Sequence, residues 1–254
     1  MSGRGLDKFW QMVGASGRQA SRAARGGCLS LLLFAVAPRV DAQTQSFAAT
    51  AGVGIDHLIL GVDDLIRGME EFARRTGVTP VKGGVHPGRG TQNALASLGN
   101  GIYVEILAPS NEAGTQRDSG TMHATLTPVG WALHTTDLPA VIAGMRAAGV
   151  ALSDIRSGAR ARPDGVQLTW QTAAATGDAM DAAPFFIHWG TGTPHPSTQS
   201  PVGCRFKSAS LGETRPAPLS KFLSTVGIAV KVSASDKRAM TIVLSCPKGE
   251  VTFR

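Results

Sequence analysis

Three side chains capable of proton transfer or metal binding lie in strand-like segments rich in hydrophobic residues. They are His57, Glu105 and His188. A carboxylate buried among apolar residues costs free energy unless it has a partner. We therefore expect Glu105 to be a metal ligand or a general base, although hydrogen bonds to loop amides would also satisfy it. The two histidines are candidates for the same site, and the alternative is a strand histidine bonded to the backbone.

A second group of polar side chains follows in the segment 83–93. His86, Arg89 and Asn93 are candidates for binding a substrate, with Arg89 and Asn93 suited to an anion or a carbonyl group. The alternative is that this segment only shapes a tight turn. It is not a phosphate loop, because no helix is predicted to begin after it.

Aromatic residues and one further histidine complete the candidates. Trp131 and Trp189 could wall a cavity and bind substrate, as could Trp170, although we expect at least two of the three tryptophans to pack in the core. The dipeptide that begins at His195 could close over the cavity or only cap a loop. Neither a Gly-x-Ser-x-Gly motif nor a cysteine–histidine pair with a supporting acid is apparent, so a nucleophilic hydrolase is not indicated.

The elements that position these residues follow a repeated pattern. A strand from Gly54 runs into a helix over about 64–76, which Asp63 or Asp64 caps, and three strands follow. The last two of these strands are joined at Asn100-Gly101, a strong hairpin signal. The predicted strands after this helix are 78–82, 91–98 and 102–107.

The pattern restarts after a polar linker, 109–127, and a weaker third copy closes the chain. Glycines suited to end the three predicted helices stand at 77, 149 and 227, at intervals of 72 and 78 residues. This spacing indicates an internal repeat of a β-α-β-β-β unit. We predict an α+β fold of two paired βαβββ modules, 54–110 and 128–190, around a cavity, and a C-terminal βαβββ-like extension over 203–254. The predicted later strands are 129–134, 152–157, 166–172, 184–189, 204–211, 228–232, 240–246 and 250–253.

Four motifs in order resemble a glyoxalase-like domain of the vicinal oxygen chelate superfamily. They are Asp56-His57-Leu58 with the segment 62–65, the loop 84–94, the strand 103–109, and the strand 184–189 followed by His195-Pro196. The resemblance covers about 54–197. It implies paired βαβββ modules and a divalent metal held by the first and last strands of each module.

Carried onto this sequence, the resemblance makes His57, Glu105 and His188 the metal ligands. The fourth ligand position falls on Gly130, which has no side chain to offer. His134 lies on the same strand face as Gly130 and is a candidate to assist catalysis or bind substrate. Two histidines and a carboxylate suit Zn, Fe, Mn or Ni and leave coordination positions open.

The resemblance implies a metal-dependent isomerase, lyase or dioxygenase that acts on a small carbonyl or vicinal-oxygen compound. The alternatives are a metal-free protein that binds or sequesters a small molecule in the same cavity, and a catalytically inert interaction domain. The expected partner is a small molecule, with a homodimer also open. The chain has no basic stripe with interleaved aromatic residues, so nucleic-acid binding is not expected.

The first 50 residues are left out of the predicted fold. The segment 1–42 carries +4 of the net charge of +7, and it includes a ten-residue apolar run before a small-residue site near 40–42. These features are typical of a secretory signal, which would make the protein periplasmic or secreted. A transit peptide, a retained membrane anchor or an unprocessed tail are the alternatives, with a cytoplasmic or organellar protein in the unanchored cases. Cys204 and Cys246 could pair in an oxidising compartment, but we favour two unpaired, buried cysteines.

Overall fold

The computed structural model describes residues 51–110, 123–178 and 180–254. The first module consists of β1 (Gly54–Gly61), α3 (Leu65–Thr76), β2 (Val81–His86), β3 (Thr91–Gly99) and β4 (Ile102–Pro109). Helix α3 begins at Asp64, whose side chain accepts a hydrogen bond from the Arg67 amide, and ends at Gly77 in the left-handed conformation with φ +82°. The predicted hairpin is present, because Asn100 and Gly101 both have positive φ between β3 and β4.

The second module repeats this order. It consists of β5 (Thr127–His134), α4 (Leu138–Ala147), β6 (Arg156–Ala161), β7 (Gln167–Ala174) and β8 (Phe185–Trp189). The Asp137 side chain caps α4 by accepting from the Ala140 amide, and Gly149 follows the helix with φ +74°. Strands β2 and β6 begin three and four residues later than predicted. Before β6, Leu152 forms only an isolated bridge with Ala175, and the Ser153 amide donates to the Ala174 carbonyl.

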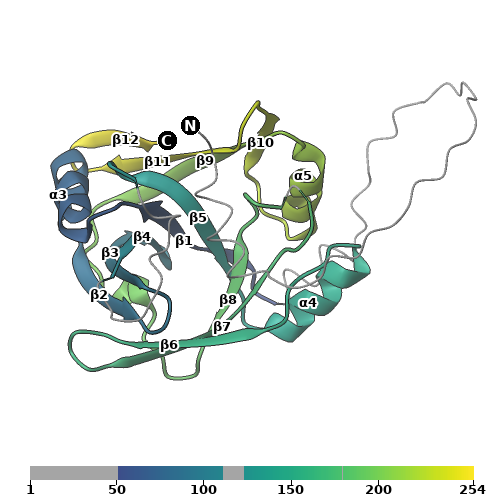
Figure 1. Cartoon of the computed structure of the whole chain (residues 1–254), viewed down its shortest axis with the longest axis horizontal. Helices are drawn as coiled ribbons and strands as arrows, with labels where there is room; N and C mark the ends of the chain where they lie inside the picture. The colour runs from purple at the N-terminus through teal and green to yellow at the C-terminus, as the bar shows by residue number, and fades with distance from the viewer. Residues whose placement is uncertain (1–50, 111–122, 179) are drawn as a thin grey trace, which may run out of the picture.

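The two modules form one eight-stranded sheet in the order β2-β3-β4-β1-β5-β8-β7-β6. Strands β1 and β5 pair antiparallel at its centre, so the modules are joined through their first strands. The sheet curves until its two edge strands, β2 and β6, contact each other (Figure 1). At this closure the Arg160 guanidinium donates to the Gly83 carbonyl, and Gly84 lies against the Ala161 backbone. The sheet therefore encloses a space with side chains from both modules.

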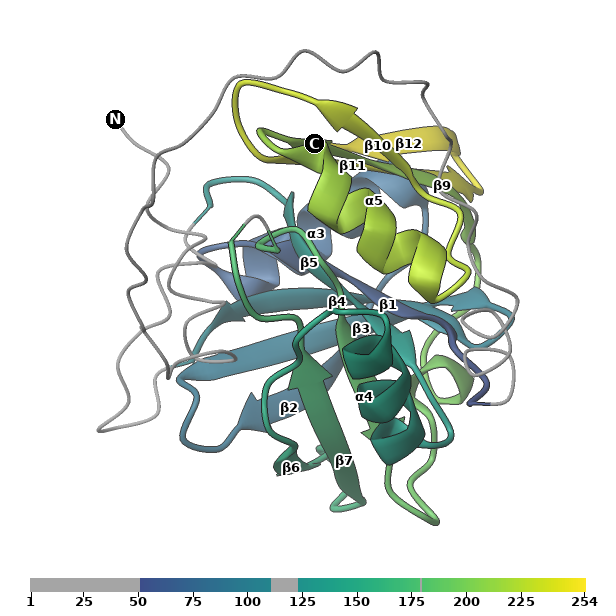
Figure 2. The same cartoon turned by 90° about the vertical axis from the view of Figure 1, so that its right-hand side faces the viewer.

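The C-terminal unit packs beside this sheet and consists of β9 (Arg205–Glu213), α5 (Pro216–Thr225), β10 (Lys231–Ala234), β11 (Ala239–Cys246) and β12 (Gly249–Phe253). Its chain order is β-α-β-β-β as predicted. Its strand order is β10-β9-β11-β12, however, with the first strand inside the sheet rather than at the end. The predicted βαβββ-like extension is therefore present in its order of elements, and its strand order differs from that of the two modules. Figure 2 shows this smaller sheet and α5 on one side of the main sheet.

The preference for unpaired cysteines is wrong. Cys204 and Cys246 form a disulfide that fixes the end of β11 to the segment before β9. Sequence spacing could not show this, because the two residues are 42 positions apart and meet only through the β9–β11 pairing. The same unit contacts α3, where Arg75 lies over the Phe253 ring and donates to the Thr252 carbonyl.

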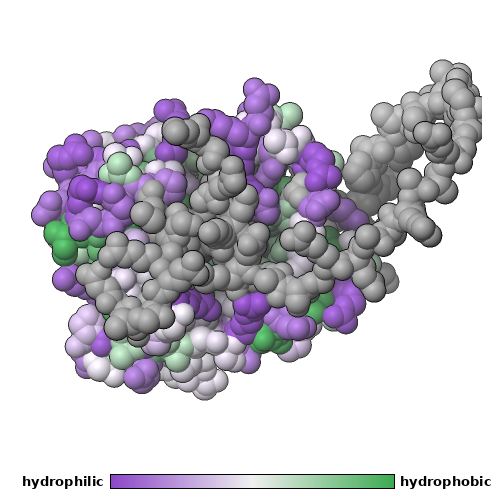
Figure 3. Space-filling model, viewed as in Figure 1, coloured by the Kyte–Doolittle hydropathy of each residue, from purple (hydrophilic) through white to green (hydrophobic). Residues whose placement is uncertain are grey.

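The proposed leader, 1–50, lies outside the described residues, as does most of the predicted linker. Among the described helices, none is long and apolar enough to cross a membrane. The face shown in Figure 3 is mostly hydrophilic where described residues are visible, with hydrophobic residues only in small patches.

Candidate functional site

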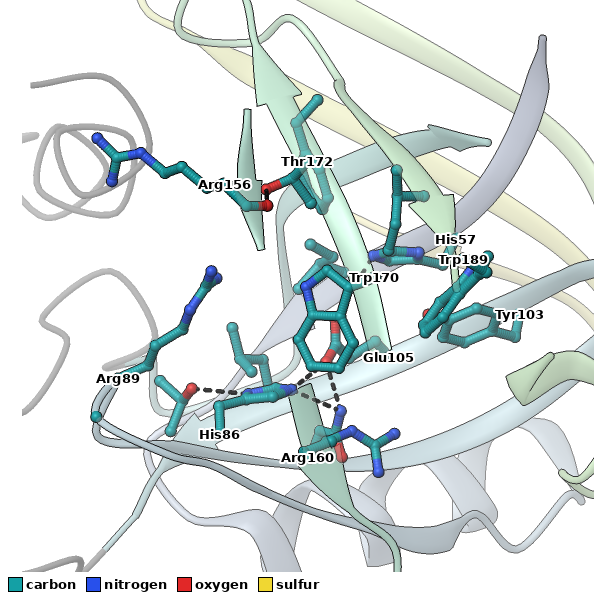
Figure 4. A pocket seen from close by; sticks show the side chains of 17 residues that line it. His57, His86, Arg89, Tyr103, Glu105, Arg156, Arg160, Trp170, Thr172 and Trp189 are labelled. Atoms are coloured by element: carbon teal, nitrogen blue, oxygen red, sulfur yellow. Dashed lines mark hydrogen bonds and ion pairs between the residues drawn. The ribbon is translucent and has the colours of Figure 1, made fainter. Parts of the chain in front are cut away.

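A pocket of ≈ 340 Å³ lies inside the curve of the eight-stranded sheet. This volume is near the lower end of the range of about 300–1,000 Å³ for small-molecule sites. Side chains of both modules line it, and Figure 4 shows them converging from facing strands. The lining residues are His57, Ile59, His86, Gly88, Arg89, Thr91, Asn93, Tyr103, Glu105, Leu107, Arg156, Arg160, Trp170, Thr172, Phe185, Ile187 and Trp189.

A β-bulge in β1 places an acid beside the histidine of the pocket. The pairing of β1 with β5 passes from Ile55 directly to His57, so Asp56 is the extra residue of the bulge. Neighbouring residues of a regular strand point to opposite faces, whereas a bulge re-aims them. Here the Asp56 Oδ1 atom lies 2.6 Å from the Nδ1 atom of His57.

The fully buried Asp56 carboxylate has three partners from three segments of the chain. Besides His57, the Trp189 indole donates to its Oδ2 atom at 3.0 Å, and the His195 Nε2 atom lies 3.1 Å from the same oxygen. Burial alone would raise the pKa of Asp56, but the hydrogen bonds and charges of the two histidines outweigh burial and hold the pKa well below its ordinary value. Asp56 is therefore ionised, and the ring nitrogens that face it carry hydrogens.

Glu105 lies on β4 between two imidazoles. Its Oε2 atom is 3.7 Å from His57 Nε2, and its Oε1 atom is 3.6 Å from His86 Nε2. Asn93 donates to Oε1 at 2.5 Å. Burial would raise the pKa of Glu105, but His86, His57 and the Asn93 hydrogen bond lower it below its ordinary value, so this carboxylate is ionised as well.

His86 is held in its neutral form. Burial is the largest effect on this imidazole, and together with nearby arginines it lowers the pKa to about 4 despite the opposing charge of Glu105. Its Nδ1 atom lies 2.9 Å from the Thr91 hydroxyl, and the Asn93 amide group lies 3.3 Å from its Nε2 atom. A donating amide at Nε2 requires a bare nitrogen there, so the proton of the ring is on Nδ1.

The pocket-facing atoms of His57 and Glu105 do not bond to each other. When His57 is neutral, its proton is on Nδ1 toward Asp56, and Nε2 is a bare acceptor. Across 3.7 Å it faces another acceptor, the Oε2 atom of Glu105. This distance is too long for a hydrogen bond, so the pair is suited to a proton on His57 or to a ligand that donates to both atoms.

Three arginines also line the pocket. Arg89 lies in the β2–β3 loop of the first module, and Arg156 and Arg160 lie on β6 of the second. Burial lowers the pKa of both Arg89 and Arg160, and Glu105 opposes this effect at each. Both guanidinium groups remain charged, because the ordinary pKa of arginine is far above neutral pH.

The structure does not bring the three predicted metal ligands together. Residues 185, 187 and 189 of β8 line the pocket, so His188 is on the opposite face, where its Nδ1 atom lies 2.9 Å from the Thr135 carbonyl oxygen. The alignment of β8 was wrong by three residues. Strand β8 pairs Phe185 with Ala132 as β4 pairs Glu105 with Ile59, so Phe185 is the true counterpart of Glu105. A shift by an odd number of residues moves every side chain to the other face of a strand.

Two further predictions fail for reasons of position. His134 shares the pocket-facing side of its strand but does not line the pocket, because it lies at the far end of β5, where its ring packs over Gly54. Trp131 does not line it either, because it is buried in the core with its indole bonded to the Ala182 carbonyl. Trp170 and Trp189 both line the pocket, so the expectation that at least two of the three tryptophans pack in the core is wrong.

The remaining candidates line the pocket, and their roles stay predictions. His86, Arg89, Asn93 and Trp189 line the pocket, as do His57 and Glu105. Sequence reasoning missed Asp56 as a partner of His57, and it missed the pocket arginines of β6. Alternation along β6 was the only available signal for Arg156 and Arg160, and the predicted strand ended too early to include the second.

The described side chains at the pocket do not provide the ligands that a divalent metal needs. Within the described ranges, no group of three or more histidine, cysteine, aspartate or glutamate side chains is arranged to hold one. The second-module ligand positions are occupied by Gly130 and Phe185, and the Nε2 atom of His86 is engaged by Asn93. His57 and Glu105 alone do not make up the three protein ligands of an ordinary catalytic metal site.

The paired βαβββ modules and the enclosed pocket define an architecture of the vicinal oxygen chelate type. The chain belongs to the glyoxalase-like domain family, whose model matches residues 55–227. The C-terminal unit therefore lies partly inside this match, through β9 and α5. No curated protein sequence matches the chain significantly.

Two solved structures are similar to this chain at low sequence identity. A hypothetical protein from Staphylococcus aureus is 20% identical, with a TM-score of 0.56 over 80% of this chain and 85% of that one. The methylmalonyl-CoA epimerase from Mycobacterium tuberculosis is also 20% identical, with a TM-score of 0.36 over 54% of this chain and 86% of that one. The likeness to the first structure shows the fold alone.

Proposed function

We propose that this glyoxalase-like protein binds a small carbonyl compound and transfers a proton on it, in a reaction of the isomerase or lyase type. The observation that supports this most is the facing pair of His57 Nε2 and Glu105 Oε2, 3.7 Å apart in the pocket wall. Proton transfer needs a group of adjustable protonation held against the substrate, and a histidine oriented by a buried carboxylate meets that need.

His57 is the proton acceptor in this proposal. Its Nε2 atom is bare when the ring is neutral, whereas the lowered pKa of Glu105 makes that carboxylate a weaker base. When Nε2 takes a proton from the carbon next to the substrate carbonyl, the ring becomes an imidazolium between two carboxylates, Asp56 and Glu105. Both carboxylates stabilise that cation, and His57 then returns the proton to a neighbouring atom of the substrate.

The negative charge that develops on the substrate oxygen also needs a partner. Arg89 and Arg160 line the same pocket and supply positive charge to it. Fixed charges in a partly buried site stabilise a developing anion more than water does. The reaction is redox-neutral and needs no co-reactant, which sets it apart from the dioxygenase alternative.

Proton transfer can be tested without knowing the natural substrate. The full chain would be incubated in D₂O with a panel of small aldehydes, ketones and 2-oxo acids, and deuterium incorporation next to the carbonyl would be followed by NMR. We expect incorporation for part of the panel, and a rate on the order of 10²–10⁴-fold lower for His57→Gln. Incorporation no faster than the buffer background for every compound would refute the proposal.

Metal dependence is tested by metal analysis and by repeating the exchange assay with a chelator. Metal analysis of the purified protein, with His57→Ala as the control, measures whether a stoichiometric ion is bound through His57. Because the described donor set does not suit a three-ligand site, we expect the exchange rate to survive treatment with a chelator. An ion lost with His57→Ala, together with activity lost on chelation, would restore the metal-dependent function predicted from sequence.

A binding protein without catalysis is the second candidate. Gly130 and Phe185 at the second-module positions favour it, since neither supplies a side chain that can bind a metal or transfer a proton. A compound that binds in the pocket of the wild-type protein but exchanges no proton in D₂O would support this candidate over the enzyme.

A further inference from the structure

We infer that the ligand of this pocket carries a carboxylate, which binds at the guanidinium of Arg89, while an apolar body fills the interior of the sheet. This inference rests on the proposed function only in placing the ligand in the same pocket. It assigns the ligand a charge and an orientation that the proton-transfer pair alone does not specify.

The first observation is the excess of positive charge at the pocket. Three arginines line it, whereas Glu105 is the only carboxylate among the described lining residues. Both oxygens of Glu105 are engaged inside the site, one by the Asn93 amide and the other opposite His57. Asp56 does not line the pocket, and its carboxylate is bonded to the three partners described above. Arg89 and Arg160 alone bring more positive charge to the pocket than Glu105 offsets, and this favours a negatively charged ligand.

The second observation is that the guanidinium of Arg89 can bind a ligand. Its guanidinium makes no hydrogen bond or ion pair with any described residue, although the side chain lines the pocket. Arg160 differs, because it is buried and donates to the Gly83 carbonyl across the closure of the sheet. Arg89 is thus free to bind a ligand, whereas Arg160 has a structural partner and adds its charge from below (Figure 4). Burial lowers the pKa of Arg89, and a ligand anion at its guanidinium would oppose this effect, as the charge of Glu105 does.

The surroundings of Arg89 favour a carboxylate over a phosphate. A guanidinium offers two parallel N–H groups that match two oxygens of either group, so the choice depends on what lies beside it. Phosphates are usually held by several backbone amides at the start of a helix, and strand β3 rather than a helix follows the Arg89 loop. Part of the wall is apolar, formed by Ile59, Leu107, Phe185, Ile187 and the aromatic rings of Trp170 and Trp189. A small acid with a hydrophobic body matches both parts of this surface.

Binding of matched pairs tests the inference. Aryl and alkyl acids of the phenylacetate kind would each be compared with their own neutral amide by isothermal titration calorimetry, using the full chain at constant ionic strength. Phenyl phosphate would serve as the phosphate arm. We expect the acid to bind about tenfold more tightly than its amide, as one charge-assisted hydrogen bond at a partly exposed site would give.

Two substitutions locate the effect. Arg89→Gln should reduce the acid-to-amide ratio to near one. The control, Arg162→Gln, removes the same charge from a residue outside the pocket that pairs with Asp164, and should leave the ratio unchanged. The inference is overturned if no acid in the panel binds more tightly than its amide, if both substitutions lower the ratio equally, or if phenyl phosphate binds better than the acids.

Failure of the inference and failure of the proposed function give different results. If acids bind through Arg89 but no compound exchanges a proton, the carboxylate site stands and the proton-transfer reaction is wrong. If neutral carbonyl compounds exchange protons through His57 and acids show no preference, the reverse holds.

Discussion

Replacing Asp56 by asparagine should damage both the fold and the proton-transfer pair. The fully buried carboxylate accepts from His57 at 2.6 Å, Trp189 at 3.0 Å and His195 at 3.1 Å. An asparagine oxygen can keep only part of this set, and its NH₂ group must face a ring N–H or reverse the tautomer of a histidine. Hydrogen bonds to a charged group contribute roughly 1.5–3 kcal/mol each, and a buried donor left without an acceptor costs roughly 1–3 kcal/mol. We expect Asp56→Asn to lower the free energy of unfolding by about 3–5 kcal/mol.

The same substitution should act on catalysis through the tautomer of His57. The asparagine NH₂ group donates to Nδ1, which moves the ring proton to Nε2 and removes the bare acceptor from the pocket. A reversed tautomer of this kind lowers the rate on the order of 10⁴-fold in hydrolase triads, and we expect deuterium exchange to fall by a similar factor.

The stability lost in Asp56→Asn should depend on pH. Because the pKa of Asp56 is lowered in the folded protein, its contribution to stability is complete above the ordinary carboxyl value of 3.8 and is lost as the pH falls through the lower, folded value. The stability difference between wild type and Asp56→Asn should therefore be constant between pH 5 and 8 and shrink only in stronger acid.

Urea denaturation and D₂O exchange measure these effects. Asp137→Asn is the matched control, because asparagine caps a helix about as well as aspartate and should change stability by no more than about 0.5 kcal/mol. A stability loss for Asp56→Asn of less than about 1 kcal/mol, or an unchanged exchange rate, would show that the three contacts do not position His57.

Three further predictions concern other parts of the molecule. Cys204→Ala with Cys246→Ala should lower the free energy of unfolding in urea by about 2–4 kcal/mol, the usual contribution of a disulfide that closes a loop of tens of residues; an unchanged urea midpoint would mean that the bond contributes nothing. Gly84→Ala places a Cβ 2.5 Å from the Ala161 carbonyl oxygen and should cost about 1–3 kcal/mol more than Gly165→Ala, which also has positive φ but meets nothing within 4 Å; equal losses would contradict the β2–β6 closure. The pKa of His86 is lowered from 6.5 to about 4, so the unfolded chain takes up this proton first and stability should fall by up to about 3 kcal/mol as the pH drops through that window. Urea titrations of His86→Gln should lack this slope, and an identical slope in wild type and variant would refute the assignment.

Much of the fold could be predicted from sequence because its signals are local. Glycines at 77, 149 and 227 end or follow the three helices with positive φ, as their spacing indicated. The hairpin at Asn100-Gly101 likewise depends on only two residues. The topology of the C-terminal unit could not be predicted, because chain order is the same for the two possible placements of β9.

About half of the site could be predicted, and the misses have physical causes. His57 and Glu105 stood out because polar groups in apolar strands need partners. Asp56 did not, because an alternating strand would turn it away from His57, and only the bulge reverses this. His188 was misplaced because strand faces alternate every residue and the alignment of β8 was in error by three residues, an odd number.

The most direct test of the central claim is a double-variant cycle on the deuterium exchange rate. His57→Gln, Glu105→Gln and the double variant would be compared with wild type on one compound that exchanges. If the two side chains handle the same proton, the double variant should be about as slow as the slower single variant, because groups that act as a unit are strongly non-additive. Effects that simply multiply, or a double variant that exchanges at the wild-type rate, would contradict the assignment of His57 and Glu105 as one proton-transfer site.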